Sequence, residues 1–293
     1  MRKKSQVWVL LAGGLGNQLF QYAFASEIAK SNNSKLMLDT SHANIIQSGL
    51  GIEEFKLDGV YLNRPKVYKK IASKLFKIEL KTLPNKYIKK NVIETPVFSD
   101  FSELYSTNCY YTGHFQSFHV ANKFLADNRL LLKSPSKNYL KMKNLYEKNS
   151  IAIHVRRGDY RNTGSWGLLS VEYYVKAISS LRLSSKENLY IYSDDVELVY
   201  KEFLSNSFFR LITKSDQITF IGTNDSLSPA ETLLLMSISE RIVIANSTFS
   251  LWAAYLNPNS NVLAPREFYR HPEKYQFPRY PNTWIVTDSA WIE

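Results

Sequence analysis

The stretch Gln6-Val-Trp-Val-Leu-Leu-Ala-Gly-Gly-Leu-Gly-Asn-Gln-Leu-Phe-Gln-Tyr-Ala-Phe-Ala25 decides how the chain begins to fold. A short apolar run over 6–11 leads into three glycines, and apolar residues then recur at helical spacing over 18–30. The apolar residues of 35–39 indicate a second strand. A strand, a glycine turn, a helix and a second strand in this order predict a βαβ opening.

The glycine turn, residues 13–18, matches neither of the common phosphate-binding loops. The dinucleotide fingerprint needs a third glycine where Leu19 stands, and a P-loop needs Lys and Ser/Thr after its last glycine. The remaining interpretation is a tight turn that lets a ligand approach the main chain at the start of the helix. The residues it presents there are Gly14, Gly16, Asn17 and Gln18.

Strands alternate with helices through the second half of the chain. Apolar runs indicate strands over 151–155, 188–192, 217–221, 241–245 and 261–264, and helical patterns cover 171–181, 196–204, 229–239 and 248–256. The third of these helices begins with a capping box and a proline at its first position. This alternation predicts a parallel, doubly wound sheet.

Residues 60–145 are less regular. In 65–78 apolar residues recur at helical spacing with lysines between them, which predicts a basic amphipathic helix. Residues 138–150 are polar and lysine-rich, with few large apolar side chains. We therefore expect a domain boundary there, dividing the chain into residues 1–146 and 147–293.

The composition narrows the class of protein. The chain has 293 residues, a formal net charge of +11 and 44% hydrophobic residues, a share too high for a disordered chain. Its one cysteine, Cys109, excludes an intramolecular disulfide scaffold. The first apolar run is too short for a signal peptide, and no run approaches the ~18 residues of a membrane span. We expect a soluble, cytoplasmic protein.

Polar residues follow the predicted strands of the second half where each strand ends. They are His154-Val-Arg-Arg-Gly-Asp159, Ser193-Asp-Asp195, Gly222-Thr-Asn-Asp225 and Asn246-Ser-Thr248. Because sheets of this type bind ligands at the carboxyl ends of their strands, these blocks predict one binding crevice.

The residue types in this crevice suit an anion. Arg156 and Arg157 offer planar donors for phosphate oxygens, although an ion pair with Asp159 would also explain them. The start of the helix after Asn246 offers amides and hydroxyls, which suit an anion or ordinary N-capping. His154 either contacts a nucleobase or donates to a neighbouring carbonyl within the strand.

The two adjacent acids Asp194 and Asp195 could suggest a metal pair. Asp195 is well placed as a helix cap, and a carboxylate that accepts hydrogen bonds from a guanine edge explains Asp194 equally well. Because no further Asp, Glu or His cluster accompanies them, we predict no metal site.

Taken together, these blocks resemble the α-1,2-fucosyltransferases of glycosyltransferase family 11. The resembling stretches are Gly13 to Ala25, His154 to Asp159, Ser193 to Asp195 and Asn246 to Ala254, with Gly113-His-Phe-Gln-Ser117 as a looser fifth block. They occur in the family's order over nearly the whole chain. The resemblance implies a GT-B-like α/β fold of two facing Rossmann-like domains, with the active site in the cleft between them. Residues 1–146 would be the acceptor-side domain and 147–293 the domain that binds GDP-fucose.

The resemblance also implies an activity. The enzyme would transfer L-fucose from GDP-β-L-fucose to the 2-hydroxyl of a terminal β-galactose, with inversion and without a metal or other cofactor. Such an enzyme would act in bacterial surface polysaccharide or O-antigen synthesis, on free or lipid-linked glycans. Two alternatives stay open: a fucosyltransferase with another class of acceptor, and a catalytically silent GDP-sugar-binding protein. A nucleic-acid binder is disfavoured because no RRM, KH or helix-turn-helix signature is present.

Residue roles follow from the same resemblance. Arg156 matches the arginine that binds the β-phosphate, Arg157 supports its loop, and Asp159 is a candidate base or orients the arginines. Guanine recognition falls to His154 and to Asp194 or Asp195. The other donor-binding positions of this half are Asn246, Ser247, Thr248 and Ser250. In the first half, Asn17 faces the donor together with Gly14, Gly16 and Gln18, and Gln116 faces the acceptor.

The excess positive charge lies largely outside these blocks. Nine lysines and one glutamate between Lys66 and Lys90 give +8 of the total +11. A basic segment with apolar residues at helical spacing suits peripheral contact with the anionic inner face of the plasma membrane. It equally suits a solvated helix whose apolar side packs on the core. The positive charge is therefore evidence about the location of the protein more than about its substrate.

Overall fold

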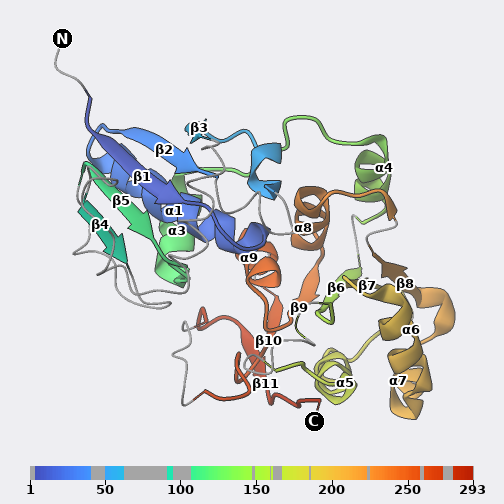
Figure 1. The fold of residues 1–293 in the computed structure, drawn as a ribbon. Helices are drawn as coiled ribbons and strands as arrows, with labels where there is room; N and C mark the ends of the chain where they lie inside the picture. Colours follow the sequence, from blue (N-terminus) through green and yellow to red (C-terminus); the bar gives the residue numbers. More distant parts are fainter. Residues whose placement is uncertain are drawn as a thin grey trace. The chain divides into compact units, whose positions relative to one another are not determined.

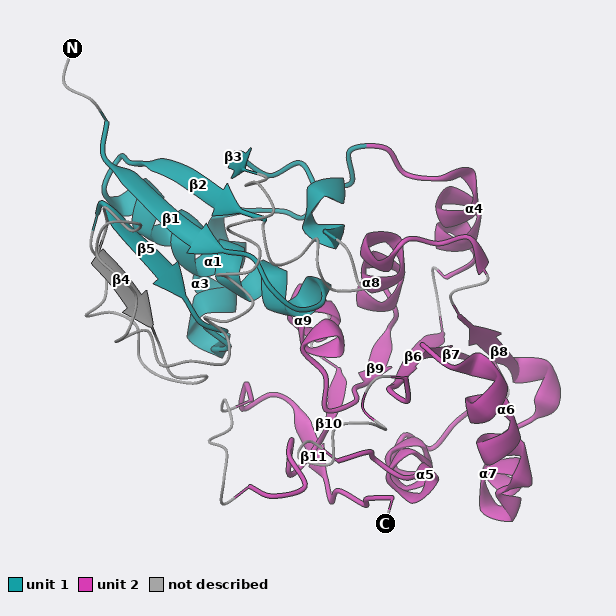
Figure 2. Cartoon of the chain, in the orientation of Figure 1, with its two compact units in different colours: residues 1–133 teal, residues 134–293 magenta. Residues whose placement is uncertain are grey.

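The computed structural model places most of the chain in two compact units (Figures 1 and 2). It describes residues 4–40, 50–62, 91–94, 107–146, 149–158, 160, 167–184, 186–222, 225–257, 261–272 and 280–292. Unit 1 comprises residues 1–133 and unit 2 residues 134–293. Each unit is built on a parallel sheet with helices, which confirms the predicted α/β class.

Unit 1 contains a five-stranded parallel sheet in the order β3-β2-β1-β5-β4 (Figure 1). Its strands are β1 (Gln6–Leu10), β2 (Lys35–Asp39), β3 (Val60–Leu62), β4 (Asn91–Glu94) and β5 (Cys109–Thr112). The predicted βαβ opening is confirmed, because α1 (Leu15–Ser31) joins β1 to the parallel strand β2.

The helices of unit 1 pack closely beside this sheet. α1 is buried on nearly all sides, and α3 (Phe118–Asp127) packs against it with the rings of Tyr22 and Phe124 in edge contact at 5.7 Å. A single turn of 3-10 helix, Gly51–Glu54, also contacts α1. Because α1 is held on several sides, the turn that precedes it is held at the end of β1.

Unit 2 contains a six-stranded parallel sheet in the order β11-β10-β9-β6-β7-β8. Its strands are β6 (Ser150–Val155), β7 (Asn188–Ser193), β8 (Ile218–Ile221), β9 (Arg241–Val243), β10 (Val262–Pro265) and β11 (Ile285–Thr287). Its helices are α4 (Lys137–Leu145), α5 (Val171–Ser180), α6 (Val196–Ser205), α7 (Ser207–Ile212), α8 (Pro229–Ser237) and α9 (Thr248–Leu256). The predicted parallel sheet of the second half is confirmed.

The central strand β6 is buried along its whole length, as expected when helices cover both faces of a sheet. Successive side chains of a strand point to opposite faces. Ile151, Ile153 and Val155 join the core formed with α5, α6 and α7. His154 points to the other face, where its ring lies 5.5 Å from that of Phe249 in α9. This alternation places His154 beside the start of α9.

The division between the units falls before α4, whereas the sequence placed the boundary after residue 146. The polar segment there is a helix: the Ser136 hydroxyl accepts a hydrogen bond from Tyr139 N at 3.0 Å and caps it. α4 packs on α8, and Ser136 N donates to Glu231 Oε1 at 2.6 Å. The helix escaped prediction because Tyr139 is its one buried side chain.

The predicted basic helix over 65–78, and the lysine-rich segment up to residue 90, lie outside the described residues. Within the described part of the chain, no helix has both the length and the apolar character needed to cross a bilayer. Membrane contact by the basic segment therefore stays a prediction.

Candidate functional site

The candidate site of unit 2 lies where three neighbouring strands end. β9, β6 and β7 are adjacent and parallel, so their carboxyl ends lie at one edge of the sheet. Arg156 follows β6, Asp194 follows β7 and Asn246 lies shortly after β9. The structure therefore brings together three of the polar blocks that the sequence predicted to share a crevice.

Arg156 supplies a positive charge at this edge. Its Nη1 lies 3.0 Å from Asp194 Oδ2, and the two side chains remain 27% and 22% exposed. Its guanidinium also lies over the ring of Tyr160, 5.3 Å from the centroid, and the Tyr160 hydroxyl donates to Asn246 O at 3.1 Å. A guanidinium held from two sides and still partly exposed can meet an anionic ligand with little reorganisation.

Gly158 allows the loop after β6 to close on Asp194. Arg157 N donates to Asp194 Oδ1 at 2.8 Å. A Cβ atom added at Gly158 would lie 2.4 Å from Oδ2 of the same carboxylate, which is a collision. The glycine of this block is therefore required by the close approach of the acid.

Arg157 has the contacts of a residue that supports the loop. Its side chain is fully buried, and Nε donates to Glu202 Oε2 at 2.8 Å. Nη1 donates to the carbonyl oxygens of Arg156 at 3.0 Å and Leu169 at 2.8 Å. With no exposed surface, the guanidinium of Arg157 acts on the main chain rather than on a ligand.

His154 is a buried, neutral imidazole next to Arg156. Burial, and secondarily the positive charge of Arg156, lowers the pKa of His154 from 6.5 to about 4. Its Nδ1 has no hydrogen-bond partner within the described residues. A neutral imidazole carries one donor and one acceptor nitrogen, so this side chain can recognise a polar edge such as that of a nucleobase.

The hydroxyls at the start of α9 divide into two kinds. The Ser247 hydroxyl caps the helix by accepting from Phe249 N at 3.3 Å, and the buried Ser250 hydroxyl donates to Ala245 O at 3.2 Å. Thr248 is partly exposed, and its hydroxyl has no hydrogen bond in the part of the chain that the structure describes. Of the three predicted hydroxyls, that of Thr248 belongs to a partly exposed residue, whereas Ser247 and Ser250 are buried, and contact with a ligand stays a prediction.

Asn246 and Asp195 have structural partners. The Asn246 side chain is buried, and its Nδ2 donates to Gly167 O at 3.1 Å. Asp195 caps α6 by accepting a hydrogen bond from Leu198 N at 3.2 Å.

Among the described residues, no three His, Cys, Asp or Glu side chains form a group that could hold a metal ion.

In unit 1, the glycine turn and the segment after β5 lie at the carboxyl ends of two adjacent strands. Asn17 Oδ1 accepts a hydrogen bond of 2.7 Å from Gln116 Nε2. Two residues predicted independently for the donor and the acceptor are therefore in direct contact. Asn17 is partly exposed, whereas Gln116 is buried.

The glycines of the turn serve different purposes. Gly13 has a φ of +74°, and a Cβ there would lie 2.6 Å from Asn17 Nδ2, so both conformation and space require glycine. Gly14 is extended, with nothing within 4 Å of an added Cβ, and it leaves the main chain open to approach. Gly16 is buried in the first turn of α1.

Gln18 is fully buried, although the sequence presented it as a donor contact. Its Nε2 donates to Gly13 O at 2.8 Å, and its Oε1 accepts from Ile52 N at 3.2 Å. Gln21 was not predicted as a site residue. Its Oε1 accepts a hydrogen bond from Ala12 N at 2.8 Å, and its Nε2 donates to Gly113 O at 3.0 Å. These amides shape the turn and tie β1 to β5.

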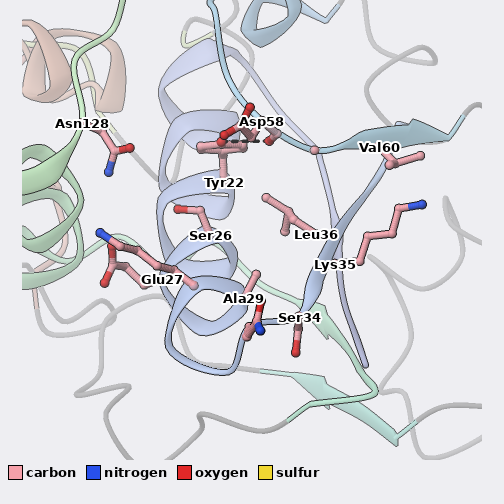
Figure 3. Close-up of a pocket in the computed structure, with 13 residues that line it drawn as sticks. Tyr22, Ser26, Glu27, Ala29, Ser34, Lys35, Leu36, Asp58, Val60 and Asn128 are labelled. Carbon is pink, nitrogen blue, oxygen red and sulfur yellow. Dashed lines mark hydrogen bonds between the residues drawn. The ribbon is translucent and has the colours of Figure 1, made fainter. Parts of the chain in front are cut away.

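A hollow of about 610 Å³ lies elsewhere on unit 1 (Figure 3). It is lined by the second half of α1, the start of β2 and the segment before β3, and Tyr22 donates to Asp58 O at 2.9 Å on its wall. None of the predicted site residues lines it. The hollow reaches the amino end of β2, so it is separate from the glycine turn, which lies at the carboxyl ends of the strands of this sheet.

Two residues around the arginines were not predicted. Tyr160 lies four positions after Arg156, and an aromatic so close to an arginine is a signal that could have been used. Glu202 stands 45 positions from its partner Arg157 and carries no local signal. The predicted residue Asp159 lies outside the described residues.

Comparison with known proteins gives a consistent picture. The model of the family described as Glycosyl transferase family 11 matches residues 6–287. An Escherichia coli protein named alpha-1,2-colitosyltransferase is 29% identical, covering 94% of this chain and 96% of that protein. The Escherichia coli protein named O-antigen biosynthesis glycosyltransferase WbnK is 26% identical, covering 96% of this chain and 98% of that protein.

Among solved structures, POFUT1 in complex with GDP matches with a TM-score of 0.50 and 12% identity. The match covers 88% of this chain and 96% of that chain. At this identity the similarity concerns the fold, and it identifies the two α/β units as a GT-B fold.

Proposed function

Because the chain belongs to glycosyl transferase family 11, we propose that it transfers L-fucose from GDP-β-L-fucose to the 2-hydroxyl of a terminal β-galactose. The family makes the protein a glycosyltransferase, and the donor, acceptor, linkage and inversion are our proposal. The names of the two Escherichia coli relatives support a glycan acceptor and an α-1,2 linkage in O-antigen synthesis.

The observation that carries the proposal is the fixed, partly exposed guanidinium of Arg156 at the edge where α9 begins. When GDP leaves, negative charge builds up on the β-phosphate while the fucosyl ring becomes oxocarbenium-like. A preorganised cation and the amides of a helix N-terminus stabilise this charge. We assign the β-phosphate to Arg156 and to the start of α9 at Thr248, with no metal in the reaction.

Two side chains suit the guanine base. A carboxylate such as Asp194 accepts hydrogen bonds from the N–H groups of guanine, and the neutral imidazole of His154 offers one donor and one acceptor. The same carboxylate pairs with Arg156, so the groups assigned to base and phosphate form one network. This linkage supports a single nucleotide site.

In unit 1 we assign donor contact to Asn17 and acceptor contact to Gln116. Amide groups suit sugar hydroxyls because they both donate and accept hydrogen bonds. Gln116 is buried and its Nε2 donates to Asn17 Oδ1 at 2.7 Å, so this hydrogen bond would link the acceptor contact to the donor contact. We assign no general base from the described residues.

A second candidate donor is GDP-colitose, and the name of the relative that is 29% identical favours it. Colitose is L-fucose without its 3-hydroxyl, so the same phosphate and guanine contacts would serve both donors. Side chains that hydrogen-bond the 3-hydroxyl would discriminate strongly against the sugar that lacks it.

The test is transfer from GDP-fucose and, separately, GDP-colitose to lactose, followed as GDP release and product formation with and without EDTA. We expect turnover with GDP-fucose that EDTA leaves unchanged. Arg156→Ala should lower kcat by about 10²–10³, the usual loss for a transition-state contact of this kind. Arg210→Ala, which removes an exposed arginine on α7, should leave kcat unchanged.

Four outcomes would contradict the proposal. Turnover with GDP-colitose alone would replace the donor. GDP binding without transfer to any galactoside would indicate a silent binding protein, and transfer to a chitin-like oligosaccharide or a protein alone would replace the acceptor. Near-normal kcat in Arg156→Ala would remove the catalytic role of this arginine.

A further inference from the structure

We infer that Glu202, in the middle of α6, is a positioning residue that aims Arg156 at the β-phosphate through the buried side chain of Arg157. The inference rests on the proposed function, because it takes the β-phosphate contact of Arg156 from there. Glu202 stands two links away from that contact and would not touch the substrate itself.

The first link is the ion pair between Glu202 and Arg157. Arg157 Nε donates to Glu202 Oε2 at 2.8 Å, and the guanidinium is fully buried while the carboxylate is 23% exposed. A buried charge without a partner is strongly unfavourable, because desolvation is not compensated. Without the carboxylate of Glu202, the guanidinium would turn toward water and leave its other contacts.

The second link runs from Arg157 to the main chain of Arg156. Nη1 of Arg157 donates to the carbonyl oxygens of Arg156 and Leu169, which lie at the start and near the end of the segment that leads from β6 to α5. Leu169 is itself held by an antiparallel bridge to Trp291. Since the guanidinium is planar and rigid, it fixes the Arg156 peptide against an anchored segment.

A further contact couples the same peptide to the side chain of Arg156. Oδ1 of Asp194 accepts a hydrogen bond from Arg157 N at 2.8 Å. Oδ2 of the same carboxylate forms an ion pair with Arg156 Nη1 at 3.0 Å. A shift of the Arg157 main chain therefore moves the carboxylate that orients the Arg156 guanidinium. Loss of Glu202 would disturb both the main chain and the side chain of Arg156.

This chain of contacts predicts a selective defect. The β-phosphate is the part of GDP that Arg156 is proposed to hold, and GMP lacks it. Disturbing Arg156 should weaken GDP binding and leave GMP binding nearly unchanged. Partial unfolding would instead lower the number of binding sites and leave both dissociation constants as they are.

The experiment is isothermal titration calorimetry of the full-length protein with GDP and with GMP. We expect the wild type to prefer GDP roughly tenfold or more, the size of a charge-assisted hydrogen bond. Glu202→Gln, which keeps shape and removes charge, should lose most of this preference, as should Arg156→Ala. The matched control is Glu197→Gln, an exposed acid in the first turn of the same helix, which should keep it.

A double variant tests whether Glu202 acts through Arg156. Arg156→Ala with Glu202→Gln should show the same GDP-to-GMP preference as Arg156→Ala alone, because coupled effects are not additive. A further loss in the double variant would overturn the inference. If Glu202→Gln does not fold, Glu202→Asp takes its place and should show an intermediate preference, and a wild-type preference there would overturn the inference.

The outcomes separate this inference from the proposed function. A preference that Arg156→Ala abolishes and Glu202→Gln retains would refute the role of Glu202 alone. A wild-type protein that binds GDP no better than GMP, or an Arg156→Ala variant that keeps the preference, would refute the proposed phosphate contact and the inference with it.

Discussion

Replacing Gly158 with alanine would force the loop after β6 away from Asp194. The added Cβ would lie 2.4 Å from Asp194 Oδ2 and 3.0 Å from Cγ, whereas ordinary contacts begin at 3.4 Å. The carboxylate, or the loop, must therefore move by about 1 Å to restore an ordinary contact distance. Such a shift breaks the 2.8 Å hydrogen bond from Arg157 N and loosens the 3.0 Å pair with Arg156.

The energetic cost can be worked from these two contacts. A hydrogen bond to a charged group contributes about 1.5–3 kcal/mol. The ion pair is 27% and 22% exposed, and solvent screening limits it to about 0–1 kcal/mol. We expect Gly158→Ala to lower the free energy of unfolding of unit 2 by about 2 kcal/mol.

The assay is urea unfolding followed by circular dichroism and by tryptophan fluorescence. These signals report both units, because Trp252, Trp284 and Trp291 lie in unit 2 and Trp8 lies in unit 1. Gly51→Ala is the control substitution. An added Cβ there has its nearest neighbour, Leu15 Cβ, at an ordinary 3.5 Å, so the expected change stays within about 0.5 kcal/mol.

A double-mutant cycle separates the collision from any other effect of the methyl group. Asp194→Ala removes the carboxylate that the methyl group would strike, so Gly158→Ala should cost almost nothing in that background. Wild-type stability of the single Gly158→Ala variant, or a full cost in the Asp194→Ala background, would refute the steric reasoning.

Two further variants test the buried histidine and the glycine turn. Burial lowers the pKa of His154 to about 4 in the folded protein, whereas the ordinary value of 6.5 applies to the unfolded chain. As the pH falls through 6.5, the unfolded chain binds a proton before the folded protein does, so acid destabilises the fold. His154→Asn should remove about 2 kcal/mol of the stability lost between pH 7 and pH 5, measured by urea unfolding, and an unchanged pH dependence would contradict the shift. Gly13→Ala, at φ +74°, should destabilise unit 1 by about 1–2 kcal/mol in the same assay, whereas unchanged stability would show that the turn relaxes.

Much of the fold could be predicted because its signals are local. The apolar runs over 6–11 and 151–155, and the helix starts at Pro229 and Thr248, each depend on residues close in sequence. The edge at which polar residues gather followed from the topology of parallel strands. Arg156 and Asp194 could therefore be placed together before their contact at 3.0 Å was known.

What could not be predicted depends on contacts between distant residues. Gln18 has the polar side chain of a ligand contact, yet tertiary packing buries it against Gly13 and Ile52. Glu202 is an ordinary acid on a helix until the fold brings it to Arg157. α4 has a mostly exposed surface, so its sequence resembles a linker. In each case contacts with residues far away in the sequence decide the role, and such contacts have no local signature.

The proposed reaction can be tested by NMR determination of the structure of the product formed from GDP-β-L-fucose and lactose. We expect a fucosyl residue with an α-configured anomeric centre, joined to the 2-hydroxyl of galactose. A β-configured product, or fucose joined to another hydroxyl, would contradict it.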